Sequence, residues 1–235
     1  MSKPRSHIHS HAPVAALRPS EYTAALIQVL RARAAHVRGA DALEIGSGSG
    51  VVLAALGALG AASLCGIDIE NEAVESGALL LRELGYGNAQ FHQGDMWRPV
   101  AGRRFNVIAA NLPQFPTMRG GFPDRLPSWS SGGPDGRALL DPFLKGLTEH
   151  LAPGGRALIT HNAFVDLELS RSIIEQCGLS LRIAMTTLVY IAGEKLNLMT
   201  PSILCEEEGR SIHRYGPYAF AEMHIVEIGG PGVFG

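Results

Sequence analysis

The chain has 235 residues, of which 46% are hydrophobic and 18% charged, and its formal net charge is −2. This length and composition suit one globular α/β domain that can bury a substantial core. The near balance of charges excludes a general basic field, so nucleic acid is not an expected partner.

The first 16 residues are a polar arm without the apolar core of a secretion signal. His7, His9 and His11 alternate within it, a pattern that could chelate a transition metal. No cysteine or carboxylate lies nearby in the sequence, so we interpret the segment as a loosely attached arm and expect no metal.

The cysteines indicate a reducing compartment. Cys65, Cys177 and Cys205 are widely spaced and form no C-x-x-C pair, which fits neither a disulfide framework nor a zinc site.

No charge occurs between Ile45 and Ile67, but the six glycines in that window favour a buried βαβ unit over a membrane span. We therefore expect a cytoplasmic protein without a membrane contact.

The first predicted elements lead into a glycine-rich turn. Apolar spacing predicts a helix over residues 20–38, with Ser20 as a candidate N-cap, and this helix is expected to cover a ligand. An apolar run over residues 42–45 then breaks into Gly46, Gly48 and Gly50. That pattern predicts a buried parallel strand and a tight turn whose backbone N–H groups approach the ligand.

The spacing of this turn favours S-adenosyl-L-methionine over NAD. A dinucleotide fingerprint needs a third glycine where Val51 stands. Glu44 lies just before the turn that contains Ser47. Its carboxylate would repel a pyrophosphate but could hold the ammonium of an amino-acid moiety. Asp68 ends the next apolar run, beside Ile69, where a carboxylate can accept both ribose hydroxyls.

The rest of the chain alternates strands and helices. Strands are predicted over residues 63–69, 89–92, 105–111, 157–160, 179–186 and 220–228, and helices over residues 51–59, 72–84, 135–151 and 166–177. Residues 153–155, Pro-Gly-Gly, are predicted as a turn. This alternation predicts a parallel sheet with ligands beyond the carboxyl ends of its strands. Asp95 falls at such an end and could accept the adenine amino group, while Met96 packs on the ring.

The fourth strand ends in the candidate catalytic residues Asn111, Leu112, Pro113 and Gln114. Pro113 constrains the path of the chain, so the Asn111 side-chain oxygen and the Leu112 carbonyl can lie side by side as two acceptors. Two acceptors suit an NH2 group and would aim its lone pair at a methyl donor. The pattern predicts N-methylation, although a hydroxyl acceptor would satisfy one of the two oxygens.

These motifs resemble those of the class I S-adenosylmethionine-dependent methyltransferases that modify the glutamine N5 of protein release factors. Asn111 and Pro113 match the Asn-Pro-Pro-Tyr motif of that family, whereas Leu112 and Gln114 depart from it. Residues 17–21 resemble its Arg-Pro-Glu-Thr segment, and residues 132–136 its Gly-Gly-x-Asp-Gly loop. The resemblance, over residues 17–186, implies a Rossmann-like doubly wound sheet of seven strands in the order 3-2-1-4-5-7-6, with the last strand antiparallel and helices on both faces.

The methyl acceptor is less defined than the cofactor. We expect one domain over residues 17–235 with substrate loops near 112–136 and 193–217; the family's N-terminal helical substrate domain is not expected. The missing substrate domain favours a small-molecule nitrogen acceptor, such as a heterocyclic or biosynthetic intermediate. Two further features favour it: Gln114 stands in place of an aromatic residue, and the following loop carries Phe115, Phe122 and Trp129. The alternatives are a protein glutamine and, from another class, a non-catalytic S-adenosylmethionine-binding protein.

Overall fold

The computed structural model describes residues 18–118 and 131–234, so the histidine-containing arm lies outside the described residues. Within these two ranges eight strands form one sheet. The strands are β1 (Asp41–Ile45), β2 (Ser63–Asp68), β3 (Gln90–Gln93), β4 (Phe105–Ala110), β5 (Leu151–Asn162), β6 (Ser180–Ile191), β7 (Ile212–Tyr215) and β8 (Tyr218–Gly229). The helices are α1 (Glu21–Ala32), α2 (Ala34–Val37), α3 (Val51–Ala58), α4 (Asn71–Glu83), α5 (Leu140–His150), α6 (Leu167–Gln176), α7 (Gly193–Leu196) and α8 (Pro201–Glu207). None of these helices is long and apolar enough to cross a membrane.

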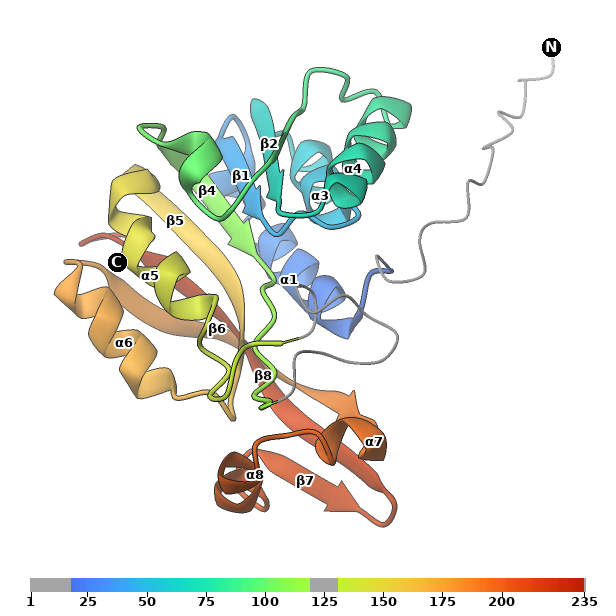
Figure 1. Cartoon of the computed structure of the whole chain (residues 1–235). Helices are drawn as coiled ribbons and strands as arrows, with labels where there is room; N and C mark the ends of the chain where they lie inside the picture. The colour runs from blue at the N-terminus through green and yellow to red at the C-terminus, as the bar shows by residue number, and fades with distance from the viewer. Residues whose placement is uncertain (1–17, 119–130, 235) are drawn as a thin grey trace.

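The sheet has the predicted strand order with one additional strand. Its order is β3-β2-β1-β4-β5-β8-β6, in which β1 to β5 are parallel and β8 runs antiparallel to both β5 and β6 (Figure 1). The predicted antiparallel last strand is therefore β8. The extra strand, β7, pairs with the start of β8 and lies off the main path of the sheet.

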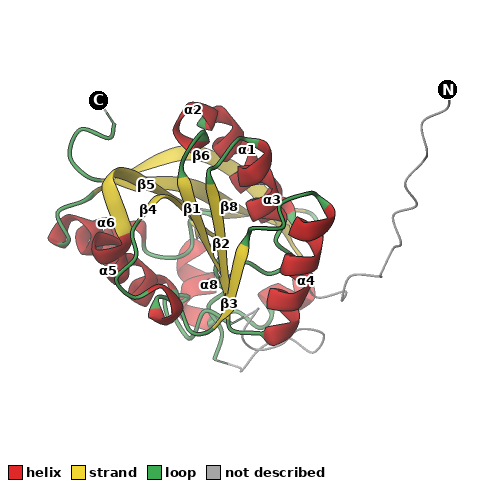
Figure 2. Ribbon diagram, turned by 90° about the horizontal axis from the view of Figure 1, so that it is seen from above, coloured by secondary structure: helices red, strands yellow, loops and turns green. Residues whose placement is uncertain are grey.

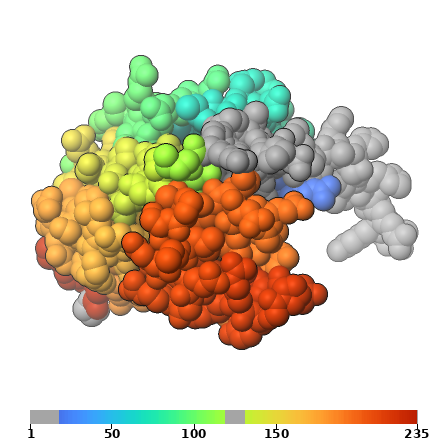
Figure 3. Space-filling model, turned by 60° about the horizontal axis from the view of Figure 1, so that its bottom comes forward, coloured from blue at the N-terminus to red at the C-terminus, as the bar shows by residue number. Residues whose placement is uncertain are grey.

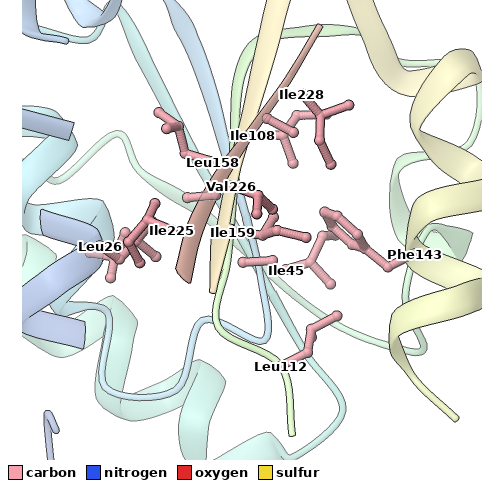
Figure 4. Packing of buried hydrophobic residues seen from close by; sticks show 14 of the residues in the cluster. Leu26, Ile45, Ile108, Leu112, Phe143, Leu158, Ile159, Ile225, Val226 and Ile228 are labelled. Atoms are coloured by element: carbon pink, nitrogen blue, oxygen red, sulfur yellow. The ribbon is translucent and has the colours of Figure 1, made fainter. Parts of the chain in front are cut away.

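Helices cover both faces of the sheet, and this accounts for the continuous apolar character of its central strands. Figure 2 shows α1, α3 and α4 on one side and α5 and α6 on the other. In the core, Leu26 of α1 lies beside Ile225, and Phe143 of α5 lies on the opposite side of the sheet with Ile45 and Ile228 (Figure 4). The strands that carry the site are thus buried on both faces.

Several predicted boundaries differ from the structure. The helix predicted over residues 20–38 divides at Arg33, whose φ of −109° and ψ of 20° separate α1 from α2. The helix predicted from residue 135 begins only at Leu140. The Pro-Gly-Gly segment lies inside β5, which starts at Leu151 and is paired with β4 across a register shift between Phe105 and Val107. A β-bulge accommodates these residues without ending the strand.

The last two strands are longer than predicted and carry an extension. β6 continues to Ile191 and β8 starts at Tyr218, so both strands run past the end of β5. Between them lie α7, α8 and β7, which occupy most of the predicted substrate loop 193–217. We call residues 187–221 the C-terminal extension; Figure 3 shows it as an orange block at the front of the view, beside the yellow-green segment that follows β4.

A buried glutamate ties the opposite end of the sheet together. Glu227 of β8 is 0% exposed and accepts hydrogen bonds from Arg156 at 2.6 Å, Arg182 at 2.8 Å and Arg33 at 3.2 Å. Burial alone would raise the pKa of Glu227, but the hydrogen bonds from Arg182 and Arg156 and the charge of Arg33 hold it below its ordinary value. The carboxylate therefore joins β5, β6 and the junction between α1 and α2 to β8.

We expect Glu227→Gln to destabilise the fold by about 3 kcal/mol, at the low end for a broken buried ion pair because Arg33 and Arg182 reach solvent. Urea unfolding measures this loss. Because the folded pKa is depressed, the stabilisation is present at neutral pH and declines as pH falls below about 4. Glu168→Gln, which removes an exposed ion pair with Arg171, is the control and should cost under about 0.5 kcal/mol. Equal stability of the two variants would contradict the prediction.

Candidate active site

A cavity of about 390 Å³ opens at the carboxyl ends of β1, β2 and β4. This is the edge at which a doubly wound sheet binds its ligands. The cavity brings together segments far apart in the sequence, including the start of α1, the glycine turn, the end of β2 and the segment after β4. Its lining includes Arg18, Thr23, Glu44, Gly46, Ser47, Gly48, Asp68, Ile69, Asp95, Met96, Asn111, Leu112, Pro113 and Leu139.

The glycine turn follows β1 directly and is fixed to the end of β2. The backbone N–H groups of Gly46 and Ser47 both donate to the Ile67 carbonyl, at 2.8 and 2.9 Å. Gly50 has a φ of +76°, and a Cβ added there would lie 2.9 Å from the Gly77 Cα. Glycine is needed at this position for both its dihedral angle and the close approach of α4. Gly50 caps α3 but does not line the cavity.

Glu44 places an unpartnered carboxylate oxygen at the floor of the cavity. The residue is 2% exposed, and its Oε2 has no hydrogen-bond partner among the described residues. Burial raises the pKa of Glu44 well above its ordinary value, a backbone hydrogen bond from Leu53 opposes this, and the charge of Asp68 adds to it. The Ser47 hydroxyl beside it is also buried without a partner. Unpaired buried groups of this kind at a cavity can be satisfied by water or by a bound ligand.

Asp68 is held in place at the end of β2 by two backbone amides. Gly48 N–H donates to its Oδ2 at 2.8 Å, and Glu70 N–H donates to its Oδ1 at 3.0 Å. Burial raises the pKa of Asp68, and these hydrogen bonds partly oppose the shift. Because each carboxylate oxygen can accept more than one hydrogen bond, both remain able to bind a pair of neighbouring hydroxyls.

Another part of the cavity wall combines an exposed apolar side chain with a residue whose backbone dihedral is unusual. Ile69 is 51% exposed although it borders the cavity. Met96 has a φ of +47°, which is unusual for a residue with a side chain and is typical of functional sites. Asp95 precedes it on the same wall. A flat apolar ligand with a polar edge would fit between these residues.

At the acceptor end, the four predicted catalytic residues have different positions. Asn111, Leu112 and Pro113 line the cavity, but Gln114 does not. The Gln114 side chain is 3% exposed; its Nε2 donates to the Thr160 carbonyl at 2.7 Å, and its Oε1 accepts from the Asn162 N–H at 3.0 Å. The prediction that Gln114 faces the acceptor is therefore corrected: its carboxamide binds the end of β5 because both backbone groups lie within its reach.

His161 and Asn162, which end β5, also lie outside the cavity lining. His161 is fully buried, its Nε2 lies 2.9 Å from Ser170 Oγ, and burial lowers its pKa to about 4. Asn162 Oδ1 accepts a hydrogen bond from the Tyr22 hydroxyl of α1 at 2.9 Å. Both residues therefore lie outside the cavity and make hydrogen bonds to neighbouring elements.

The Gly-Gly-Pro-Asp-Gly segment, residues 132–136, packs against residues 111–117 after β4, which we call the acceptor segment. Gly132 N–H donates to the Phe115 carbonyl, and Thr117 N–H donates to the Gly133 carbonyl, each at 2.9 Å. A Cβ added at Gly136 would lie 2.5 Å from the Gln114 carbonyl oxygen. The glycines of this motif therefore permit a close backbone contact that holds the acceptor segment in place.

The C-terminal extension meets the same segment. Thr200 N–H donates to the Pro116 carbonyl at 2.9 Å, and the Thr200 hydroxyl donates to the Pro134 carbonyl at 2.6 Å. The Lys195 ammonium lies 4.8 Å from the centre of the Phe115 ring. The two predicted substrate loops are thus in contact, whereas Phe122 and Trp129 lie outside the described residues.

The start of α1 contributes cavity residues that were not among the predicted cofactor ligands. Arg18 and Thr23 line the cavity, and Arg18 is the one cationic side chain among the described lining residues. The Thr23 hydroxyl accepts a hydrogen bond from the Ser20 N–H at 3.3 Å. Two features of the sequence could have identified these residues: the Arg-Pro pair before the helix, and the expectation that this helix covers a ligand.

Comparisons with known proteins agree with this geometry. A family model described as "Methyltransferase domain" matches residues 36–192. A Methanocaldococcus jannaschii protein, provisionally named protein N5-glutamine methyltransferase, is 31% identical over 149 residues, which are 63% of this chain and 75% of that protein. Release factor glutamine methyltransferase of Vibrio cholerae is 34% identical over 97 residues, 40% of this chain but only 34% of the relative.

Solved structures of low identity share the fold. A ribosomal protein L11 methylase from Lactobacillus delbrueckii has a TM-score of 0.55 and 16% identity, with 88% of this chain and 79% of that chain covered. The YcgJ protein of Bacillus subtilis has a TM-score of 0.60 and 14% identity, with 87% and 97% covered. These likenesses match the predicted Rossmann-like architecture.

The residues present fit the implied cofactor. Glu44 offers an unpartnered carboxylate oxygen and Asp68 two partly used ones. Gly46 has a φ of +71°, which favours glycine, and a Cβ added there would lie 3.2 Å from Leu112 Cδ2. The match to the methyltransferase family confirms the predicted preference for S-adenosylmethionine over NAD. It also supports an enzyme over the alternative of a non-catalytic binding protein. The chain belongs to the class I S-adenosylmethionine-dependent methyltransferases.

Proposed function

We propose that this enzyme methylates the nitrogen of a primary carboxamide, the group at the end of a protein glutamine side chain. The observation that carries the proposal is the position of Asn111 and Leu112, side by side on the cavity wall at the end of β4. An asparagine oxygen and a backbone carbonyl are two acceptors, which match the two hydrogens of an NH2 group. The names of the M. jannaschii and V. cholerae relatives support the same acceptor class.

We assign the cofactor contacts by chemical complementarity. Glu44 would bind the ammonium of S-adenosylmethionine, while Arg18 and Thr23 would bind its carboxylate. Asp68 would accept hydrogen bonds from the ribose hydroxyls. Ile69, Asp95, Met96 and the backbone around Gly46, Ser47 and Gly48 would complete the pocket for the adenine and the sulfonium side, with Gly50 shaping the turn from outside. When bound, the cofactor supplies the electrophilic methyl group.

The protein's contribution to the reaction would be alignment. Asn111 Oδ1 and the Leu112 carbonyl would hold both hydrogens of the acceptor, which directs the nitrogen lone pair towards the methyl donor. Pro113 fixes the φ angle of the chain after these acceptors and so keeps them in one plane. Holding two reactants in this geometry removes much of the entropic cost of a bimolecular step.

The acceptor end of the cavity is uncharged. Asn111, Leu112, Pro113 and Leu139 carry no formal charge, and the one cationic lining residue is assigned to the cofactor. A neutral acceptor is therefore favoured over a phosphate or a carboxylate. Gln114 was an argument for a small molecule, but its side chain binds β5, so that argument no longer separates a small molecule from a protein glutamine.

Asp68→Ala should weaken S-adenosylhomocysteine binding by about 100-fold, because two hydrogen bonds to a charged acceptor are lost. Isothermal titration calorimetry measures the affinity. The control is Asp41→Ala, which removes an exposed aspartate at the opposite end of β1 that bonds Ser63. Unchanged affinity in Asp68→Ala would contradict the assignment of the ribose site.

S-adenosylhomocysteine affinity should increase as pH rises above the ordinary pKa of a glutamate, because a carboxyl with a raised pKa must lose its proton to bind an ammonium. Glu44→Gln should weaken binding at high pH and reduce this slope, leaving the part that arises from Asp68. Calorimetry across the pH range gives both quantities. A variant with the wild-type slope would show that Glu44 does not bind the ammonium.

Asn111→Ala should lower methyl transfer to glutamine-containing peptides by at least about 100-fold, as expected when one oriented polar group is removed from the reacting centre. Its affinity for S-adenosylhomocysteine should stay within about twofold. Radiolabelled methyl transfer measures the rate, with the same peptide carrying glutamate as the acceptor control.

A panel of nitrogen heterocycles separates the acceptor classes. Transfer to peptides and not to heterocycles is the expected result. Transfer confined to heterocycles would overturn the carboxamide proposal and favour the small-molecule alternative. Full activity of Asn111→Ala would overturn the role of Asn111 with either acceptor.

A further inference from the structure

The acceptor residue Asn111 does not stand alone on the cavity wall. Thr160, the third residue from the end of β5, is 2% exposed, and its hydroxyl donates a hydrogen bond to Asn111 Oδ1 at 2.9 Å. The carbonyl of the same threonine accepts the hydrogen bond from Gln114. One residue of β5 therefore contacts both ends of the segment 111–114.

The hydroxyl of Thr160 distinguishes the two ends of the Asn111 carboxamide. The oxygen and the NH2 group of an asparagine have nearly the same shape, so a flip of the amide costs little by packing alone. Within the described residues, Asn111 Oδ1 is the acceptor that the structure provides for the Thr160 hydroxyl. After a flip the amide NH2 could donate to the hydroxyl oxygen, but the hydroxyl hydrogen would lose its acceptor, and a buried donor without an acceptor is disfavoured.

The backbone around this contact is held independently of it. The Asn162 N–H and the Thr160 carbonyl bind the Gln114 carboxamide, and the Tyr22 hydroxyl in turn binds Asn162. On the other side, Gly136 packs against the Gln114 carbonyl. Removal of the Thr160 hydroxyl should consequently release the Asn111 side chain and leave the path of the backbone unchanged.

We propose that Thr160 is a positioning residue of the methyl-acceptor site, which holds the Asn111 carboxamide so that its oxygen is available to the NH2 group of the acceptor. The inference rests on the proposed function of Asn111. One lone pair of Oδ1 accepts from Thr160, and the second remains for the acceptor. An amide freed to flip would spend part of its time presenting NH2 to NH2, an arrangement in which the acceptor is repelled.

The test uses three variants of the full chain. Thr160→Val removes the hydroxyl with little change in shape, Thr160→Ser keeps the hydroxyl, and Thr186→Val removes a different sheet hydroxyl, which bonds His224. Thr160→Ala serves as a second variant without the hydroxyl if Thr160→Val does not fold. Each is compared with wild type after calorimetry confirms that it binds S-adenosylhomocysteine.

The first measurement is independent of the acceptor. In 15N-labelled enzyme bound to S-adenosylhomocysteine, the side-chain amide signals of Asn111 are assigned by their loss in Asn111→Asp. We expect one sharp pair of signals in wild type, Thr160→Ser and Thr186→Val, and doubled or broadened signals in Thr160→Val. A single sharp pair at the wild-type position in Thr160→Val would overturn the proposal.

The second measurement is methyl transfer to a glutamine peptide. Thr160→Val should lower kcat by about tenfold, the equivalent of one hydrogen bond, with unchanged S-adenosylhomocysteine affinity, and Thr160→Ser should restore it. An effect of Thr186→Val as large as that of Thr160→Val, or no rescue by serine, would indicate a general structural role and overturn the proposal. If wild type methylates no glutamine peptide, the carboxamide proposal fails, and the amide signals still decide the role of Thr160.

Discussion

The hydrogen bonds between the glycine turn and the end of β2 are the constraint on which the rest of the site depends. Gly46 and Ser47 donate to Ile67, and Gly48 donates to the carboxylate of Asp68. These backbone hydrogen bonds fix the turn against the end of β2 and orient the Asp68 carboxylate that lines the cavity. Because β1 and β4 are neighbouring parallel strands, they end at the same edge of the sheet, and the segment after β4 therefore lies beside this cavity.

The two halves of the site are stabilised by different means. In the cofactor half, backbone turns hold two acids, Glu44 with an unpartnered oxygen and Asp68 with capacity for further hydrogen bonds. The acceptor half is held by hydrogen bonds within the protein: the Tyr22 hydroxyl binds the Asn162 side chain, and the Gln114 carboxamide binds the Asn162 N–H and the Thr160 carbonyl. The first half therefore keeps hydrogen-bonding capacity for a ligand, whereas the second uses its own within the protein.

Local patterns predicted the parts of the fold that local chemistry determines. The glycine turn, Asp68 and Asn111 could be located because each falls where an apolar run ends, and the strand order followed from the family resemblance. The role of Gln114 could not be predicted, since its partners lie 46 and 48 residues away on β5. Thr160 was missed for the same reason, because Asn111 lies 49 residues away, directly after another strand. β7 pairs with the strand that follows it, but the sequence analysis assigned its residues to a substrate loop.

The continuity of β6 and β8 into the C-terminal extension separates two tasks along the same strands. Their inner parts complete the sheet beside β5, and their outer parts carry α7, α8 and β7 past its end. The extension is thus supported by two long strands, and none of its described residues lines the cavity. A fold arranged in this way can acquire a new acceptor through changes in one terminal segment while its methyl-donor chemistry is preserved.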